Sequence, residues 1–141
     1  MGHAFHQLYY HTVWATHARD PHIHSSFRSA LLGLVHEEAI GRGGKPIRHN
    51  AMPDHVHLLV RLPPTVRLSE FIGQVKGAVA FRTNSEIKPK FKLHWQEGYG
   101  ALTLRKDELQ KVSRYIDNQE KHHGSGRLSS LLERTDSDEE S

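Results

Sequence analysis

Apolar residues along this chain follow two patterns, one typical of strands and the other typical of helices. Residues 7–16 are rich in aromatic and β-branched side chains, which predicts a strand. From near Phe27, apolar residues recur at intervals of three and four, which predicts a helix. They are Leu31, Leu34, Val35 and Ala39. We expect Ser25 or Ser26 to cap this helix and the glycines within residues 41–44 to end it.

The middle of the chain predicts a hairpin followed by a second helix. Residues 45–51 and 55–62 are predicted strands, and residues 52–54 form the turn between them. A second set of apolar residues with helical spacing predicts a helix from near Arg67 to about Thr83. These residues are Leu68, Phe71, Ile72, Val75 and Val79.

The last part of the pattern completes an α+β fold. Residues 93–104 predict two short strands broken at Glu97 and Gly98, and a long helix is expected from about Lys106 to His122. The order is therefore β-α-β-β-α-β with an additional C-terminal helix. This is the split βαβ arrangement of ferredoxin-like and RRM-like proteins, built on an antiparallel sheet.

Length and composition limit the classes of protein that fit. The 141 residues suit a single domain, which we place at 1–134, and the polar residues 135–141 are expected to be disordered. The chain has no cysteine, which excludes disulfides and thiolate metal sites. No apolar run approaches the roughly 18 residues of a membrane span, and the N-terminal residues lack the pattern of a signal peptide. We therefore expect a cytoplasmic protein, associated with the nucleoid when it acts, and no membrane partner.

Charge is distributed unevenly along the chain. The whole chain has a net charge of +3. Five acidic residues and one arginine give residues 133–141 a net charge of −4, so the rest of the chain carries +7. A basic body of this kind is typical of proteins that bind an anionic partner, most commonly a nucleic acid.

The predicted strand at 55–62 carries two histidines on one face. Because side chains alternate between the faces of a strand, His55 and His57 point the same way, with Cβ atoms about 6.5 to 7 Å apart. The residues that form the opposite, apolar face are Val56, Leu58, Val60 and Leu62. Two imidazoles at this separation can bind one divalent ion. The chain contains 13 histidines, so a solvated or hydrogen-bonded pair remains the alternative.

The predicted C-terminal helix offers partners for this pair. Tyr115 and Gln119 are four positions apart and therefore lie on one face of the helix. The amide oxygen of Gln119 is a suitable ligand for Mg²⁺ or Mn²⁺, and the phenol of Tyr115 can act as a covalent nucleophile. The alternative is a half-buried tyrosine beside a solvated glutamine.

Four stretches of the chain, in this order and spacing, resemble the insertion-sequence-200-like transposases, which are single-tyrosine enzymes of the HUH superfamily. HUH stands for a histidine, a bulky hydrophobic residue and a second histidine. The stretches are YHTVWAT at 10–16, MPDHVHLLV at 52–60, WQEGYGALTL at 95–104 and YIDNQEKHH at 115–123.

The resemblance implies a role for each residue of the candidate site. His55, His57 and Gln119 would hold a divalent cation, Mg²⁺ or Mn²⁺, and no organic cofactor is implied. Tyr115 would cleave single-stranded DNA, leaving a 5′-phosphotyrosine and a free 3′-OH that rejoins the strand at a new junction. Members of the family act as homodimers joined through their sheets and recognise imperfect DNA hairpins at the ends of the element. Whether the helix of Tyr115 serves its own chain or the partner chain is left open.

Basic residues outside this set are candidates for DNA binding. Arg61, Lys76 and Arg82 are interpreted as phosphate contacts, with ordinary solvated charges as the alternative. His11 is interpreted as a structural residue, because alternation along the first strand does not tell which face it takes.

Two further functions are compatible with the same residues. One is a related HUH nickase, or a domesticated protein that processes genomic repeats, since His17 stands where the family is expected to have Lys or Arg. The other is a catalytically silent module that binds single-stranded nucleic acid through its sheet. Such a module would have no need for Tyr115 and Gln119 one turn apart.

Overall fold

The computed structural model describes residues 4–119. Four strands form one antiparallel sheet in the order β2-β3-β1-β4, which is the expected ferredoxin-like arrangement. The elements in chain order are β1 (Tyr9–Ala15), α1 (Arg28–Gly41), β2 (Lys45–Met52), β3 (His55–Arg61), α2 (Leu68–Arg82), β4 (Gly100–Leu104) and α3 (Leu109–Asp117). The predicted acidic tail at 135–141 lies outside the described residues.

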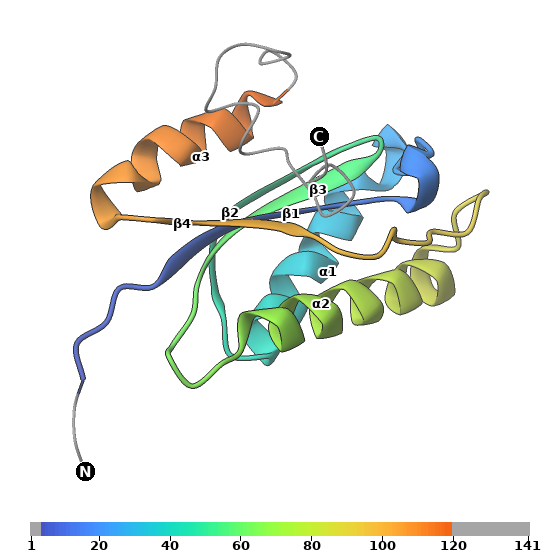
Figure 1. Ribbon diagram of the computed structural model, residues 1–141. Coiled ribbons are helices and arrows are strands. Elements are labelled where there is room, and N and C mark those ends of the chain that lie inside the picture. The colour runs from blue at the N-terminus through green and yellow to red at the C-terminus, as the bar shows by residue number, and fades with distance from the viewer. Residues whose placement is uncertain (1–3, 120–141) are drawn as a thin grey trace.

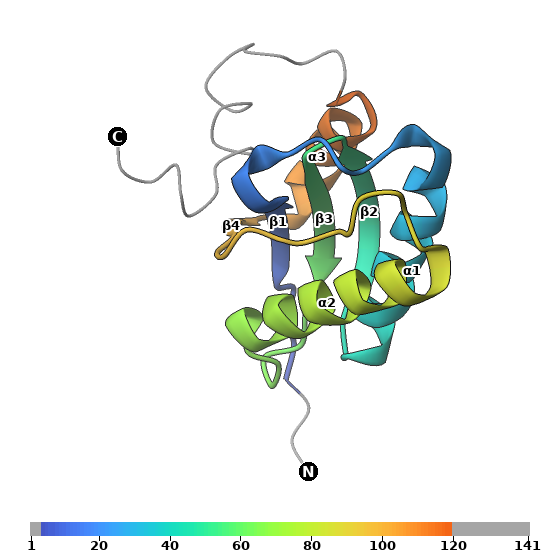
Figure 2. The same ribbon diagram turned by 90° about the vertical axis from the view of Figure 1, so that its right-hand side faces the viewer.

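The sheet is covered on both faces. Helices α1 and α2 lie along one face and α3 lies on the other, as Figures 1 and 2 show. The buried residues of α1 are the four that its periodicity predicts, and all the buried residues of α2 are among the five predicted there. Among the described residues, no helix is both long and apolar enough to cross a bilayer.

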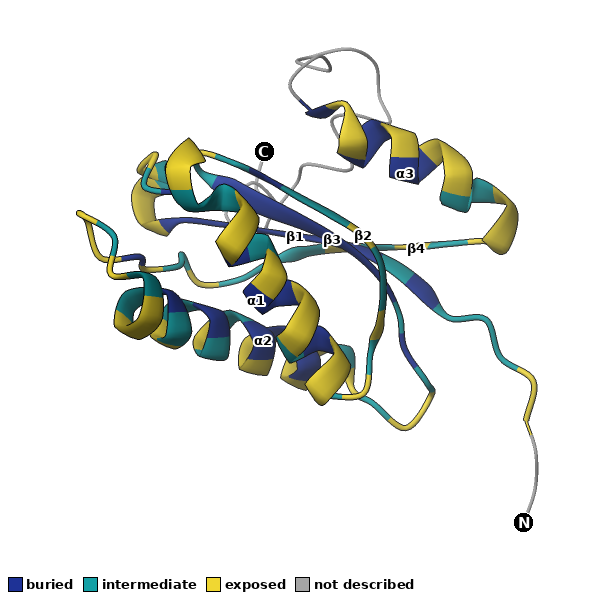
Figure 3. Cartoon of the chain, turned by 180° about the vertical axis from the view of Figure 1, so that it is seen from behind, coloured by how far each residue is buried: buried dark blue, intermediate teal, exposed yellow. Residues whose placement is uncertain are grey.

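The central strands are buried on both sides. All residues of β3 before Arg61 are buried, and the outer faces of α1 and α2 carry the exposed positions (Figure 3). Val56, Leu58 and Val60 belong to the main core between the sheet and the two helices. Leu59 points the other way, into a smaller cluster with Val112, Tyr115 and Ile116 of α3. The strand therefore separates an apolar core from the face that carries its histidines.

The start of α1 differs from the prediction. A short 3₁₀ turn at Ser25–Phe27 precedes the helix, and Phe27 is its N-cap residue without a side-chain hydrogen bond. The His24 side chain instead accepts a hydrogen bond from the backbone N–H of Ser26. The prediction that a serine caps α1 is therefore wrong. The capping side chain is that of His24, and it caps the 3₁₀ turn before the helix.

Only the second of the two predicted strands within 93–104 forms. The first is reduced to a single bridge between Thr16 and Trp95. Two backbone hydrogen bonds join it to the end of β1, from the N–H of Gln96 to Ala15 and from the N–H of His17 to His94. Its other backbone bonds are with side chains: Lys76 donates to two carbonyl groups of the segment, and Asn84 exchanges two hydrogen bonds with the backbone of Leu93. The segment is therefore held against α2 and the turn that follows it, and does not extend the sheet.

Helix α3 is shorter than predicted. It ends at Asp117, and the carbonyl oxygen of Arg114 accepts hydrogen bonds from both the backbone N–H and the side chain of Asn118. Gln119 follows in a turn. The rest of the predicted helix, up to His122, lies outside the described residues.

Candidate active site

The four residues predicted for the active site gather on the α3 face of the sheet. His55 and His57 of β3 are 7% and 0% exposed, and their ring centroids are 5.0 Å apart. The ring of Tyr115 on α3 lies edge-on to that of His57, with centroids 5.9 Å apart. Gln119 is also buried, and its Nε2 lies 3.5 Å from the phenol oxygen of Tyr115.

Helix α3 is held over the histidines by contacts with β2 and β3. The Asn50 side chain on β2 donates a 2.8 Å hydrogen bond to the carbonyl oxygen of Ile116. Arg48, on the same strand, lies 3.6 Å from the carboxylate of Asp117. Together with the apolar contacts of Val112 and Ile116 on Leu59, these bonds place Tyr115 beside the histidines of its own chain.

Each histidine of the pair has one ring nitrogen engaged. Nδ1 of His55 lies 2.7 Å from a carboxylate oxygen of Asp54, and Nδ1 of His57 lies 2.8 Å from Nε2 of His11. The Nε2 atoms of His55 and His57 are buried and have no hydrogen-bond partner among residues 4–119. A buried polar atom without a partner is costly, so two such atoms in one site point to a missing ligand.

His11 belongs to the site, although the sequence led us to interpret it as structural. In the antiparallel register it lies opposite Leu59, so it faces α3 together with His57, and it is 1% exposed. The alternation of side chains along β1 could have indicated which face His11 takes. If Trp14 faces the helix-side core, where the structure places it, then His11 must face the opposite side.

Asp54 is the second residue that the sequence reasoning missed. We interpreted it only as part of the turn between two strands, but its carboxylate is bonded to His55 and lies 3.7 Å from Arg19. The hydrogen bond from His55 lowers the pKa of Asp54, so this carboxylate is ionised at neutral pH. Carboxylate partners of this kind orient histidines that bind metals.

Burial keeps the two central imidazoles neutral. Burial, with a smaller effect of the charge on His55, lowers the pKa of His11 to about 3. Burial also lowers the pKa of His57 well below its usual value, with smaller effects of the charges on His11 and His55. A neutral imidazole has one N–H and one lone pair, so one member of the His11–His57 hydrogen bond donates and the other accepts.

The donor set fits a hard divalent cation. Within residues 4–119, no group of three or more His, Asp or Glu side chains could hold a metal ion, so a third ligand from this part of the chain would be of another type. The amide oxygen of Gln119 has the right chemistry, and the buried Gln119 side chain contacts Tyr115, whose ring lies against that of His57. Two imidazoles and an amide oxygen leave positions open for phosphate oxygens or water.

Arg61 lies away from this site, at the opposite end of β3 from His55. It donates to the backbone carbonyl of His6, and its guanidinium lies 5.6 Å from the centroid of the Tyr9 ring. Lys76 is on α2, on the other side of the sheet, where its ammonium group binds the carbonyl oxygens of Gln96 and Gly98. Burial lowers the pKa of Lys76.

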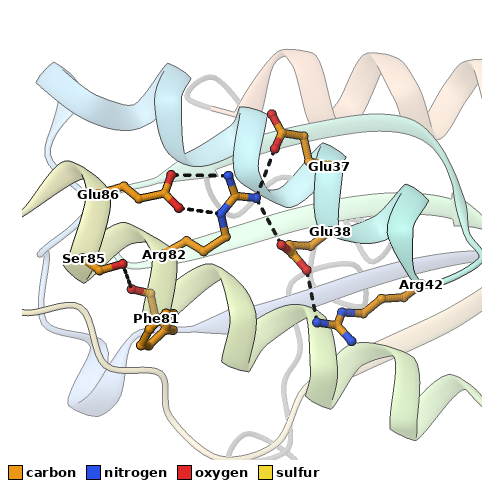
Figure 4. A network of polar contacts seen from close by, with 7 residues as sticks. All are labelled: Glu37, Glu38, Arg42, Phe81, Arg82, Ser85 and Glu86. Atoms are coloured by element: carbon orange, nitrogen blue, oxygen red, sulfur yellow. Dashed lines mark hydrogen bonds and ion pairs between the residues drawn. The ribbon is translucent and has the colours of Figure 1, made fainter.

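Arg82 is the centre of an ion-pair network between α1 and α2, shown in Figure 4. Its guanidinium contacts the carboxylates of Glu37, Glu38 and Glu86 at 2.9 to 3.1 Å. Glu38 also binds Arg42 at 3.2 Å. The structure therefore gives each of the three basic residues predicted to bind DNA an internal contact and places none of them beside Tyr115. Their contact with DNA stays a prediction.

Known proteins resemble this chain over most of its length. The family described as transposase IS200 like matches residues 4–119. The ISDra2 transposase TnpA of Deinococcus radiodurans is 29% identical over 118 residues, which cover 80% of this chain and 84% of that protein. The transposase for insertion sequence element IS200 of Salmonella typhimurium is 25% identical over 115 residues, which cover 78% of this chain and 75% of that protein.

Two solved structures have a similar fold. The crystal structure of a candidate transposase from Deinococcus radiodurans has a TM-score of 0.66 and 27% identity, over 84% of this chain and 96% of that one. A REP-associated tyrosine transposase bound to a REP hairpin has a TM-score of 0.61 and 15% identity, over 88% of this chain and 75% of that one. The second likeness concerns the fold alone.

Proposed function

The chain belongs to the IS200-like transposase family and is a DNA transposase, and on that premise we propose that it cleaves and rejoins single-stranded DNA with Tyr115 as the nucleophile. The observation that carries the proposal is the position of Tyr115, whose ring lies 5.9 Å from that of His57 in a buried group with Gln119. A phenol beside two imidazole nitrogens that have no hydrogen-bond partner within residues 4–119 is a set of groups suited to phosphoryl transfer.

The proposed reaction exchanges one phosphodiester for another. The Tyr115 oxygen forms a bond to phosphorus as the bond from phosphorus to the 3′ oxygen of the upstream nucleotide breaks. The phenol loses its proton, and the leaving 3′ oxygen takes one up. The downstream strand then remains on the protein as a 5′-phosphotyrosine, and attack by a 3′-OH reverses the step. The phosphoester bond is conserved, so rejoining needs no external energy source.

His55, His57 and Gln119 are the residues that would hold a divalent cation, Mg²⁺ or Mn²⁺, in this site. When bound, such a cation polarises a phosphate oxygen and stabilises the charge that develops during attack. The protein supplies position: α3 holds the phenol, and the side chain of Gln119, two residues past the end of α3, lies 3.5 Å from the phenol oxygen.

We propose that the DNA substrate is a hairpin with a single-stranded flank and that the active form is a homodimer. A hairpin is what the structurally similar REP-associated transposase binds, and the basic body of this chain suits a DNA partner. The outer strands β2 and β4 form the edges of the described sheet, where a second copy could pair. Because the ring of Tyr115 lies 5.9 Å from that of its own chain's His57, we place Tyr115 and its histidines in the same chain.

Labelled oligonucleotides test this function. The full-length protein, with Mn²⁺ or Mg²⁺, is incubated with a hairpin oligonucleotide that carries a single-stranded flank and a label at its 5′ or 3′ end. We expect the 3′ label to appear in a covalent protein adduct and the 5′ label in a shortened free strand. Capture of the 5′ label, or cleavage without an adduct, would contradict the proposal. Failure to join ends after cleavage would favour a nickase.

His11 is expected to position His57 for metal binding. With Nδ1–H of His57 donating to Nε2 of His11, the lone pair of His57 is on Nε2, which has no hydrogen-bond partner in the described part of the chain. We expect His11→Leu to weaken Mn²⁺ binding by about 10- to 100-fold, and His11→Gln, which keeps an acceptor, to recover part of the loss.

Two measurements check the role of His11. Mn²⁺ affinity is measured by electron paramagnetic resonance on the full chain, without DNA. The tautomer of His57 is read from ¹⁵N chemical shifts of the imidazole, which should change in His11→Leu and less in His11→Gln. Wild-type affinity for Mn²⁺ in His11→Leu would show that His11 only fills space.

A further inference from the structure

Two phenylalanine rings are exposed near the end of α2 and in the loop after it. Phe81 is 72% exposed and Phe91 is 56% exposed. His22, from the loop between β1 and α1, stacks on Phe91 with centroids 5.1 Å apart and planes 13° apart. Neighbouring apolar groups that stay exposed mark a binding surface when they form one patch, and the stacked rings of His22 and Phe91 offer a flat face to a third ring.

Lysines surround these rings. Lys88, Lys90 and Lys92 alternate along the loop and are exposed, and Nζ of Lys90 lies 5.5 Å from the centroid of Phe91. Two hollows of about 610 and 540 Å³ adjoin here, and Lys88 and Lys90 line both. Within the described chain, neither hollow has an Asp or Glu in its lining. We call Phe81, Phe91, His22 and the three lysines the aromatic–lysine surface.

This surface lies at the same end of the sheet as the candidate active site. The loop that carries His22 is bonded to the turn before β3, since the N–H of Ile23 donates to the carbonyl oxygen of Pro53. Arg19 in the same loop lies 3.7 Å from Asp54, the residue that binds His55. Figure 1 shows this blue loop and the yellow loop after α2 at the same end of the molecule. A strand that leaves the active site in this direction would meet the rings and lysines.

We propose that the aromatic–lysine surface binds the single-stranded flank of the DNA substrate, with a base stacked on Phe91 and His22 and phosphates against the lysines. Exposed aromatic faces interleaved with basic side chains are what single-stranded nucleic acid needs, because every base has a π-face and every linkage a negative charge. An acidic or purely apolar partner would use only half of these groups. The inference rests on the proposed function for the identity of the strand, but the contact itself requires no cleavage.

Binding measurements on the full chain test the surface. The probe is a fluorescein-labelled 20-nucleotide poly-dT strand without a hairpin, followed by fluorescence anisotropy across a range of NaCl concentrations. We expect Phe91→Ala to weaken binding by about ten-fold, the loss of one stacked base. Phe5→Ala is the matched control, since Phe5 is 85% exposed and lies outside the surface. Wild-type affinity in Phe91→Ala overturns the proposal.

The lysines have a separate readout. Lys90→Gln with Lys92→Gln should reduce the slope of log Kd against log salt by about 1.4, since each phosphate contact on a single strand contributes about 0.7. Lys45→Gln with Lys106→Gln, which changes net charge equally at exposed positions elsewhere, is the control. Equal slopes in the two double variants overturn the proposal, because they mean that only total charge matters.

Cleavage separates this proposal from the function on which it rests. If the wild type cleaves hairpins but Phe91→Ala binds poly-dT normally, the surface proposal fails and the proposed function stands. If the wild type does not cleave yet Phe91→Ala binds poly-dT about ten-fold more weakly, the surface proposal stands and the proposed function fails. An unchanged melting temperature in each variant confirms that the fold is intact.

Discussion

Replacing Tyr115 by phenylalanine should abolish the covalent protein–DNA adduct while the fold and hairpin binding persist. The ring of Tyr115 is 6% exposed and packs with Leu59, Val112 and Ile116, contacts that phenylalanine retains. The substitution removes only the hydroxyl group, which is the proposed nucleophile and lies 3.5 Å from Nε2 of Gln119. Loss of a nucleophile lowers the rate by about 10³-fold or more, so no adduct should accumulate.

Tyr9 provides the matched control for this result. It is the other buried tyrosine of the described residues, 5% exposed on β1, and its ring lies under the guanidinium of Arg61. Tyr9→Phe should cleave and form the adduct as the wild type does. If Tyr115→Phe gives the wild-type amount of the same adduct, the nucleophile is a different residue.

His55→Ala should lose metal-dependent cleavage by at least about 100-fold and keep hairpin binding in a gel-shift assay. The lost Nε2 atom is buried and lacks a hydrogen-bond partner within the described chain. The Asp54 carboxylate loses its contact with Nδ1 of His55, but it is partly exposed to water and keeps Arg19 at 3.7 Å. His55 is the first residue of β3, and its backbone pairing with Ala15 and Met52 does not depend on the side chain. Raising the Mn²⁺ concentration should recover part of the activity, because the weakened site still has other ligands.

His49→Ala is the control for the histidine substitution. His49 is half-buried on β2, and its ring lies against His36 on α1, away from α3. This variant should cleave with the wild-type dependence on Mn²⁺. A loss of hairpin binding in His55→Ala that matches its loss of cleavage would count against a metal-binding role.

Periodicity predicted most of the fold because the elements pack by their own apolar faces. The stripe of α1 was predicted residue by residue, and the alternation along β3 correctly assigned Leu58 to the core. The first strand predicted within 93–104 is reduced to one bridge, because beyond two backbone bonds to Ala15 and His17 its hydrogen bonds are with the side chains of Lys76 and Asn84. A local pattern of residues carries no information on such partners.

The same limit applies to the candidate site. The spacing of Tyr115 and Gln119 and the parity of the histidine pair are local features, and the structure brings all four residues together. The bond between His11 and His57 joins residues 46 positions apart, and Arg82 meets Glu37 across 45 positions. Sequence alone could not distinguish a basic side chain that forms internal ion pairs from one that is free to contact DNA.

The burial of β3 on both faces ties activity to correct strand pairing. In the observed register, His57 lies opposite Val13 of β1 and Asn50 of β2, while Leu58 faces the helix-side core. A slip of one residue would turn the histidines into the main core and expose the leucines to the polar site. Such a misfolded chain would lose its stability and its active site in one step. The alternation of residues along β3 therefore disfavours misfolded forms that persist and still cleave DNA.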